Sequence, residues 1–181
     1  EQHNIIHQGM SSDKIARQWN IPREELDQFS ANSHAKAAAA TSKGSFKDEI
    51  VPVMGVDDAG APVEVSMDQG IRPNVSLEKM GSLKPAFGED GVTTAGNSSQ
   101  ITDGAAALIV TTPERARELG LTPRARIVSV TTVGSDPHLM LTGPVAATKK
   151  ALARAGKAIA DMDLIEINEA FATVVCMWQR E

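Results

Sequence analysis

The stretch Asp163-Leu164-Ile165-Glu166-Ile167-Asn168-Glu169-Ala170-Phe171-Ala172 carries the most information about the fold of this 181-residue chain. It predicts an apolar strand over 163–167 that is followed at once by a helix, with Asn168 in the turn between them. In an α/β sheet, ligand-binding groups gather outside the carboxyl ends of the strands. An asparagine there can offer a fixed N–H donor to a developing oxyanion. The residues alone leave open a plainer role for Asn168, as a helix N-cap.

The rest of the chain predicts an α/β layer architecture around this turn. Strands are predicted over 104–110, 125–133 and 163–167, and helices over 112–120, 144–155 and 170–180. This alternation favours parallel strands joined by right-handed crossovers. The first half differs: it predicts helices over 14–19, 22–44 and 76–83 and a hairpin formed by 50–54 and 63–67.

Composition excludes several classes of function. The chain is 41% hydrophobic and 23% charged, as is usual for a globular protein. Aromatic residues make up only 3%, Tyr is absent and the formal net charge is −5, which argues against nucleic-acid binding. No apolar run has the length of a membrane span. The single cysteine, Cys176, excludes an intrachain disulfide, is expected to be a core residue and predicts a cytoplasmic, reducing location.

Both ends of the chain predict that it is an internal segment of a longer protein. The sequence begins at Glu1 with neither an initiator Met nor the pattern of a signal peptide. The last predicted helix runs to Glu181 without a C-terminal Gly or Pro.

Stretches in series along the chain resemble the thiolases, enzymes that make or cleave 3-oxoacyl-CoA. They are Phe46–Pro52, Gly70–Pro73 with Leu83–Phe87, Thr93–Ser99 with Asp103–Ala107, and Asn168–Ala172. The resemblance implies a thiolase-like layered αβαβα architecture, here incomplete, with a helical and hairpin loop-domain insertion. It implies that residues 1–87 form the CoA-binding loop domain, 88–122 the end of the N-terminal half and 123–181 the start of the C-terminal half.

The resemblance assigns one catalytic residue to this chain. In thiolases a cysteine takes the acyl group, a histidine activates that cysteine and a second cysteine moves the other proton. The family places the first residue before this segment and the other two after it, and Cys176 matches neither cysteine. Asn168 matches the asparagine that holds a water in the oxyanion hole of the thioester, and Glu169 is expected to support the turn. The segment alone is therefore predicted to be inactive.

The resemblance also implies a binding site for CoA as a substrate, with no cofactor and no metal. Arg72 matches a position near the nucleotide end, and Ser99 matches a serine that hydrogen-bonds the pantetheine arm, beside Ala95. Apolar tunnel positions and a tunnel histidine are matched by Leu83, Met140, Phe171 and His7, although the residues around His7 diverge from the family. Taken without the resemblance, Arg72 reads as an exposed loop residue and the apolar residues read as core. His34 and His138 are expected to face solvent.

The implied function is part of an acyltransferase of fatty acid metabolism that works through an acyl-cysteine intermediate. It would act by thiolysis or Claisen condensation, and the full-length protein would be a homodimer or homotetramer. Thr93–Asp103 and Ala172–Trp178 are closer to degradative thiolases. Two alternatives stay open, a non-catalytic acyl-CoA-binding or scaffold protein and an inactive truncated product.

Overall fold

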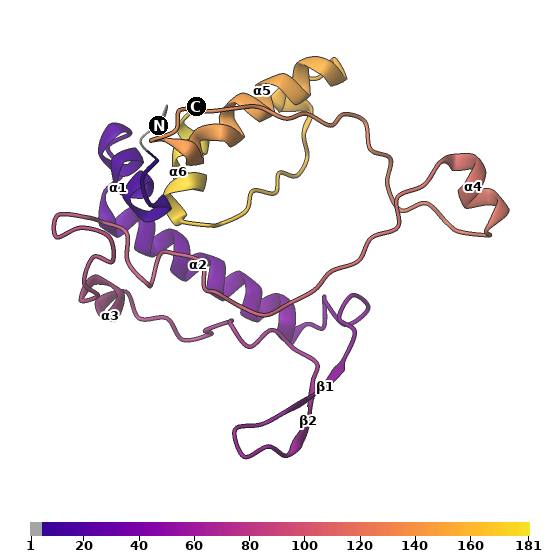
Figure 1. Ribbon diagram of the computed structural model, residues 1–181, viewed down its shortest axis with the longest axis horizontal. Helices are drawn as coiled ribbons and strands as arrows, with labels where there is room; N and C mark the ends of the chain where they lie inside the picture. Colours follow the sequence, from indigo (N-terminus) through magenta and orange to yellow (C-terminus); the bar gives the residue numbers. More distant parts are fainter. Residues whose placement is uncertain (1–4) are drawn as a thin grey trace.

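The computed structural model describes residues 5–181, and its folded body is made of helices (Figure 1). Helices α1 (Gln8–Gln18), α2 (Arg23–Ser42) and α6 (Ala172–Arg180) come together at one side of the molecule. Helix α5 (Gly143–Ala155) lies beside them and follows the short 3-10 turn η1 (Met140–Thr142). None of the helices in the described part is both long and apolar enough to cross a membrane.

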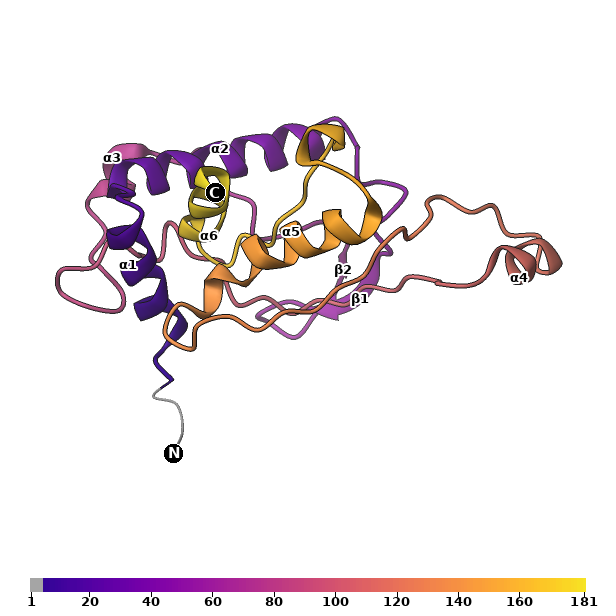
Figure 2. The same ribbon diagram turned by 90° about the horizontal axis from the view of Figure 1, so that it is seen from above.

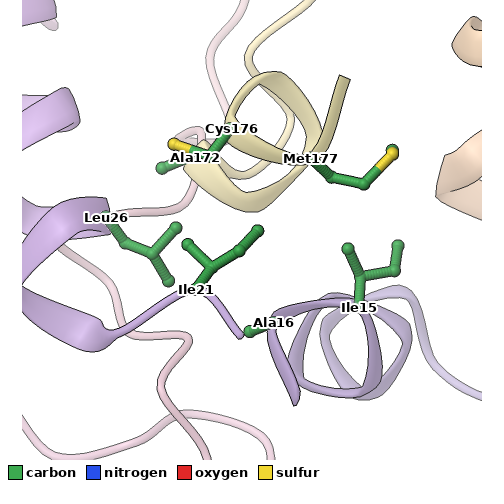
Figure 3. Close-up of a cluster of buried hydrophobic side chains, with 7 residues drawn as sticks. All are labelled: Ile15, Ala16, Ile21, Leu26, Ala172, Cys176 and Met177. Carbon is green, nitrogen blue, oxygen red and sulfur yellow. The ribbon is translucent and has the colours of Figure 1, made fainter. Parts of the chain in front are cut away.

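The hydrophobic core joins the two ends of the chain. It consists of Ile15, Ala16, Ile21, Leu26, Ala172, Cys176 and Met177 (Figure 3). Ile15, Leu26 and Met177 are each fully buried. Each such side chain contributes about 1.5–3 kcal/mol when it is removed from water, so these contacts hold α6 against α1 and α2.

Buried hydroxyl and carboxylate groups attach the loop after Val92 to this core. Asp13 accepts hydrogen bonds from the backbone N–H groups of Val92 and Thr93, both at 2.9 Å. The hydroxyl of Ser12 bonds to the hydroxyls of Thr93 and Thr173. These bonds satisfy polar groups that would be costly to bury alone.

The helices and the hairpin expected from the sequence are present. Helices α3 (Leu77–Gly81) and α4 (Pro113–Glu118) form within their predicted ranges, and α1 begins six residues before its predicted start. Strands β1 (Val53–Val56) and β2 (Pro62–Val65) pair antiparallel, with Val53 opposite Val65. The hairpin extends away from the helices in Figure 1.

The strands predicted over 104–110, 125–133 and 163–167 are wrong for this chain. All three segments are extended but belong to no sheet in the described part. A strand is stable only when its N–H and C=O groups bond to a neighbouring strand. The segments before and after α4 are instead long arms that project away from the helices, and 163–167 is a separate connection that leads to α6 (Figures 1 and 2). Their apolar side chains are consequently exposed, with Leu108 and Leu164 both 93% accessible.

Candidate functional site

A groove of about 620 Å³ lies between α2, the segment around α3, the loop 95–100 and the turn at Asn168. Its volume is in the range of small-molecule binding sites. The groove collects residues from distant parts of the sequence, including Arg72, Leu83, Ala95, Ser99 and Asn168.

Helix α2 forms one wall of the groove. The residues that line it recur at spacings of three and four along one face of the helix: Phe29, Ser30, Ser33, His34 and Ala37. The first turns of α2 are held by buried contacts, because Leu26 is fully buried in the core and Asp27 is 3% exposed. The wall is therefore anchored to the core.

Asn97 holds the loop that forms the opposite side. Its side-chain Nδ2 donates to Asp27 Oδ1 at 2.9 Å and to the carbonyl of Val92 at 3.0 Å. Its Oδ1 accepts from the backbone N–H of Thr94 at 2.8 Å. Every polar atom of this buried carboxamide is used, so the loop that presents Ala95 and Ser99 has a defined conformation.

Gly96 lets the same loop lie close to Leu83. A Cβ atom at position 96 would come within 2.8 Å of Leu83 Cδ1, closer than carbon atoms pack. A larger residue would push the loop and Leu83 apart.

Asn168 lies at the edge of the groove, exposed, in a segment without regular structure. The N-cap of α6 is Phe171, so the interpretation of Asn168 as a helix cap is wrong. The chain after Asn168 is tied to the loop: the Ser99 N–H donates to the Ala170 carbonyl at 2.9 Å, and the Ala172 N–H donates to the Asn97 carbonyl at 3.0 Å. Asn168 and the predicted pantetheine loop therefore line the same groove.

Arg72 also lines the groove, and it contacts α2 through its backbone. Its N–H donates to His34 Nδ1 at 3.2 Å. This bond requires Nδ1 to be the unprotonated nitrogen of the imidazole, which leaves Nε2 as the atom able to donate. His34 was expected at the surface, but it is half-buried and lines the groove.

Three further predicted residues lie outside the groove lining. His7 caps α1 by accepting from the Gly9 N–H, and its ring stacks on Phe87 with 4.8 Å between ring centroids. Phe171 is 7% exposed and meets Phe87 edge-on. Met140 begins η1 and is half-buried. Their role as tunnel residues stays a prediction.

The segment before Met140 is fixed by Asp136. Its Oδ1 accepts from the backbone N–H groups of His138 and Leu139, at 2.7 and 2.9 Å. These two bonds stabilise the carboxylate and lower the pKa of Asp136. His138, expected in solvent, is half-buried beside Lys14 and Arg17.

Comparison with known proteins identifies the family. The model of the thiolase N-terminal domain matches residues 1–114, and that of the thiolase C-terminal domain matches residues 121–181. The chain belongs to the thiolase family.

Two relatives show how much of a thiolase the chain represents. It is 49% identical over 168 residues to the 3-ketoacyl-CoA thiolase of Citrobacter koseri, covering 92% of this chain and 43% of the relative. It is 48% identical over 169 residues to the acetyl-CoA acetyltransferase of Paracoccus denitrificans, covering 93% and 43%. This thiolase chain therefore spans less than half the length of the curated relatives it matches.

A solved thiolase structure has the same course of the chain. The crystal structure of the Bacillus anthracis acetyl-CoA acetyltransferase superposes with a TM-score of 0.92 at 39% identity, over 99% of this chain and 45% of the other. The predicted fold class, an incomplete thiolase-like α/β architecture, is confirmed. The exposed arms thus follow the path of a thiolase chain although they form no sheet here.

Cys176, the only cysteine of this thiolase chain, is unsuited to act as a nucleophile. It is 3% exposed in the core cluster and is not part of the groove lining. Burial, with a smaller effect of the nearby Glu25 carboxylate, raises the pKa of the thiol to about 11. Because the thiolate is the reactive species, this thiol is unreactive at neutral pH.

Several groove residues that the sequence analysis missed lie on α2. Ser33 and His34 were not predicted as site residues, because neither belongs to a sequence motif of the chain. Ser33 and His34 share one face of the helix with Phe29 and Ala37. If one residue of this face were known to line a site, the helical spacing would predict that the others line it too.

Proposed function

We propose that this chain is the part of a thiolase that binds CoA and completes the oxyanion hole, in an enzyme that cleaves or forms 3-oxoacyl-CoA. One observation carries the proposal: Arg72, Leu83, Ala95, Ser99 and Asn168, which resemble family positions for CoA binding and oxyanion stabilisation, line a single groove. The relatives named 3-ketoacyl-CoA thiolase and acetyl-CoA acetyltransferase support this reaction class.

In the proposed mechanism, the groove holds CoA along its length. The Arg72 guanidinium attracts phosphate and can stack on adenine at the nucleotide end. Ser99 hydrogen-bonds the pantetheine arm, which Ala95 lets approach the backbone closely. At the other end Asn168 holds a water that donates to the thioester oxygen as negative charge develops on it.

The acyl-cysteine of the proposed reaction forms on a residue outside these 181 residues, since Cys176 is buried and protonated. We divide the chain into a CoA-binding loop domain (1–87), the end of the N-terminal half (88–122) and the start of the C-terminal half (123–181). We propose a homodimer or homotetramer for the whole enzyme, and its cytoplasmic location stays a prediction.

The chain alone is expected to show no turnover of acetoacetyl-CoA with CoA, because the groups for the covalent and proton-transfer steps are missing. The positive control is a hybrid enzyme, in which this chain replaces the matching segment of the Citrobacter koseri thiolase. Release of acetyl-CoA by the isolated chain that survives Cys176→Ala would refute the need for an outside cysteine. Turnover abolished by Cys176→Ala would make Cys176 the nucleophile instead. A hybrid that folds and binds CoA without turnover would favour the non-catalytic acyl-CoA-binding protein.

Arg72→Ala in the hybrid enzyme is expected to raise the KM for CoA with kcat nearly unchanged. The nucleotide end of CoA is far from the reacting bonds, so its binding stabilises ground state and transition state equally. An increase of about tenfold corresponds to the loss of one charge-assisted contact at a solvated site. Initial rates at varied CoA concentration measure it, with Arg115→Ala on the exposed α4 as control. An unchanged KM would remove Arg72 from the CoA site.

A further inference from the structure

The turn that carries Asn168 is held in place by very few bonds. Among the described residues, the backbone of 163–169 takes part in no hydrogen bond, and the first backbone anchor after Asn168 is the Ala170 carbonyl. Asn168 and Glu169 are both exposed. A donor that stabilises an oxyanion has to be held in position before the reaction, since a mobile donor loses its advantage over water.

One side-chain bond supplies an anchor beside Asn168. The hydroxyl of Ser33 donates to Glu169 Oε2 at 2.7 Å, across 136 positions in the sequence. The bond is exposed to solvent, so it is expected to contribute as much as an ordinary hydrogen bond. It joins the loose turn to the groove-lining face of α2, and both residues line the groove.

The two partners of this bond differ in how firmly they are held. Ser33 is half-buried on a 20-residue helix. That helix is fixed to the core by Leu26 and to the neighbouring loop by the hydrogen bond that Asn97 Nδ2 donates to Asp27 Oδ1 at 2.9 Å. Glu169 lies on a segment without regular structure. The position of the helix therefore determines the position of the turn, and not the reverse.

We propose that Ser33 is a positioning residue of the thiolase reaction, which fixes Asn168 through the carboxylate of Glu169. The inference rests on the proposed oxyanion role of Asn168. Ser33 does not touch the reacting atoms; it limits the positions that the neighbouring carboxamide can take. The effect belongs to the transition state, because only there does the held donor face a developed negative charge.

The test is a set of variants of the hybrid enzyme. Ser33→Ala should lower kcat about fivefold, the rate equivalent of one ordinary hydrogen bond, and leave the KM for CoA unchanged. Ser33→Thr keeps the hydroxyl and should recover most of the rate. Asn32→Ala, on the exposed side of the same helix turn, is the matched control and should have no effect.

A double-mutant cycle separates positioning from a general effect on the fold. If Ser33 acts through Asn168, Ser33→Ala should cause no further loss once Asn168 is Ala, because the residue being positioned is gone. An equal loss in both backgrounds, or no loss in the wild-type background, would overturn the proposal for Ser33. Failure of the proposed function gives a different result, in which Asn168→Ala itself leaves kcat unchanged.

Discussion

Asn168→Ala in the hybrid enzyme is expected to lower kcat about 100-fold while the KM for CoA changes little. Removal of a single donor from an oxyanion hole has an effect of this order. The carboxamide acts, through a held water, on charge that is present only in the transition state. Losing such an interaction lowers kcat and kcat/KM together. Steady-state kinetics of acetoacetyl-CoA thiolysis measure both constants.

The matched control is Glu166→Ala, an exposed residue two positions earlier in the same segment, which should stay within about twofold of the parent enzyme. CoA binding measured by calorimetry should be the same for both variants. If Asn168→Ala left kcat within about twofold while the protein stayed folded, Asn168 would lose its catalytic assignment. Since it does not cap α6, it would then be an ordinary residue of the turn.

The helices were predictable because their start signals are local. Thr112 and Ser76 are the first residues of two predicted helices, and each is the N-cap of the observed one. Thr112 Oγ1 accepts from the Arg115 N–H at 3.2 Å, and Ser76 Oγ accepts from the Lys79 N–H at 3.3 Å. These bonds span three residues, so a short stretch of sequence contains both partners. The hairpin is equally local, since its strands are joined by five residues.

The remaining strands could not be decided from the sequence, because their stability depends on partners elsewhere. Residues 104–110 have the apolar composition of a buried strand. In the structure, however, the apolar side chains of Leu108, Ile109 and Val110 are all exposed. A sequence shows that a segment is suited to a sheet. It does not show whether a neighbouring strand is present to receive its hydrogen bonds.

The groove could be predicted only through the family resemblance. Arg72 and Asn168 are almost a hundred positions apart, and no periodicity or spacing relates them. The internal support of the groove was missed for the same reason. Arg23 and Asp27 are visible as an i,i+4 pair on a helix. The third member of their network, Asn97, lies 70 positions after Asp27 and carries no motif of its own that points back to α2.

Asp27 is the residue of this network on which stability should depend most. The residue is 3% exposed, and its carboxylate accepts from Arg23 Nε at 2.7 Å and from Asn97 Nδ2 at 2.9 Å. Arg23 in turn donates to the carbonyls of Met80 and Leu83 at the end of α3. Through these bonds Asp27 connects α2 with the 93–99 loop and, by way of Arg23, with the segment around α3 that lines the groove.

Asp27→Ala is therefore expected to destabilise the packing of α2 on the loop by about 3 kcal/mol, the lower end of the cost of leaving a buried charged partner unpaired. The lower end of this range applies because the Arg23 side chain is 17% exposed, so water partly solvates it once the Asp27 carboxylate is removed. In native-state hydrogen exchange of the 181-residue chain, amides of α2 and of Thr94 and Asn97 should exchange about 100-fold faster. Asp58→Ala, in the exposed hairpin turn, should leave these amides unchanged. If the amides of α2 kept their protection in Asp27→Ala, the carboxylate would not be what holds helix and loop together. The packing of α2 on the loop would then depend on apolar contacts such as those of Leu26.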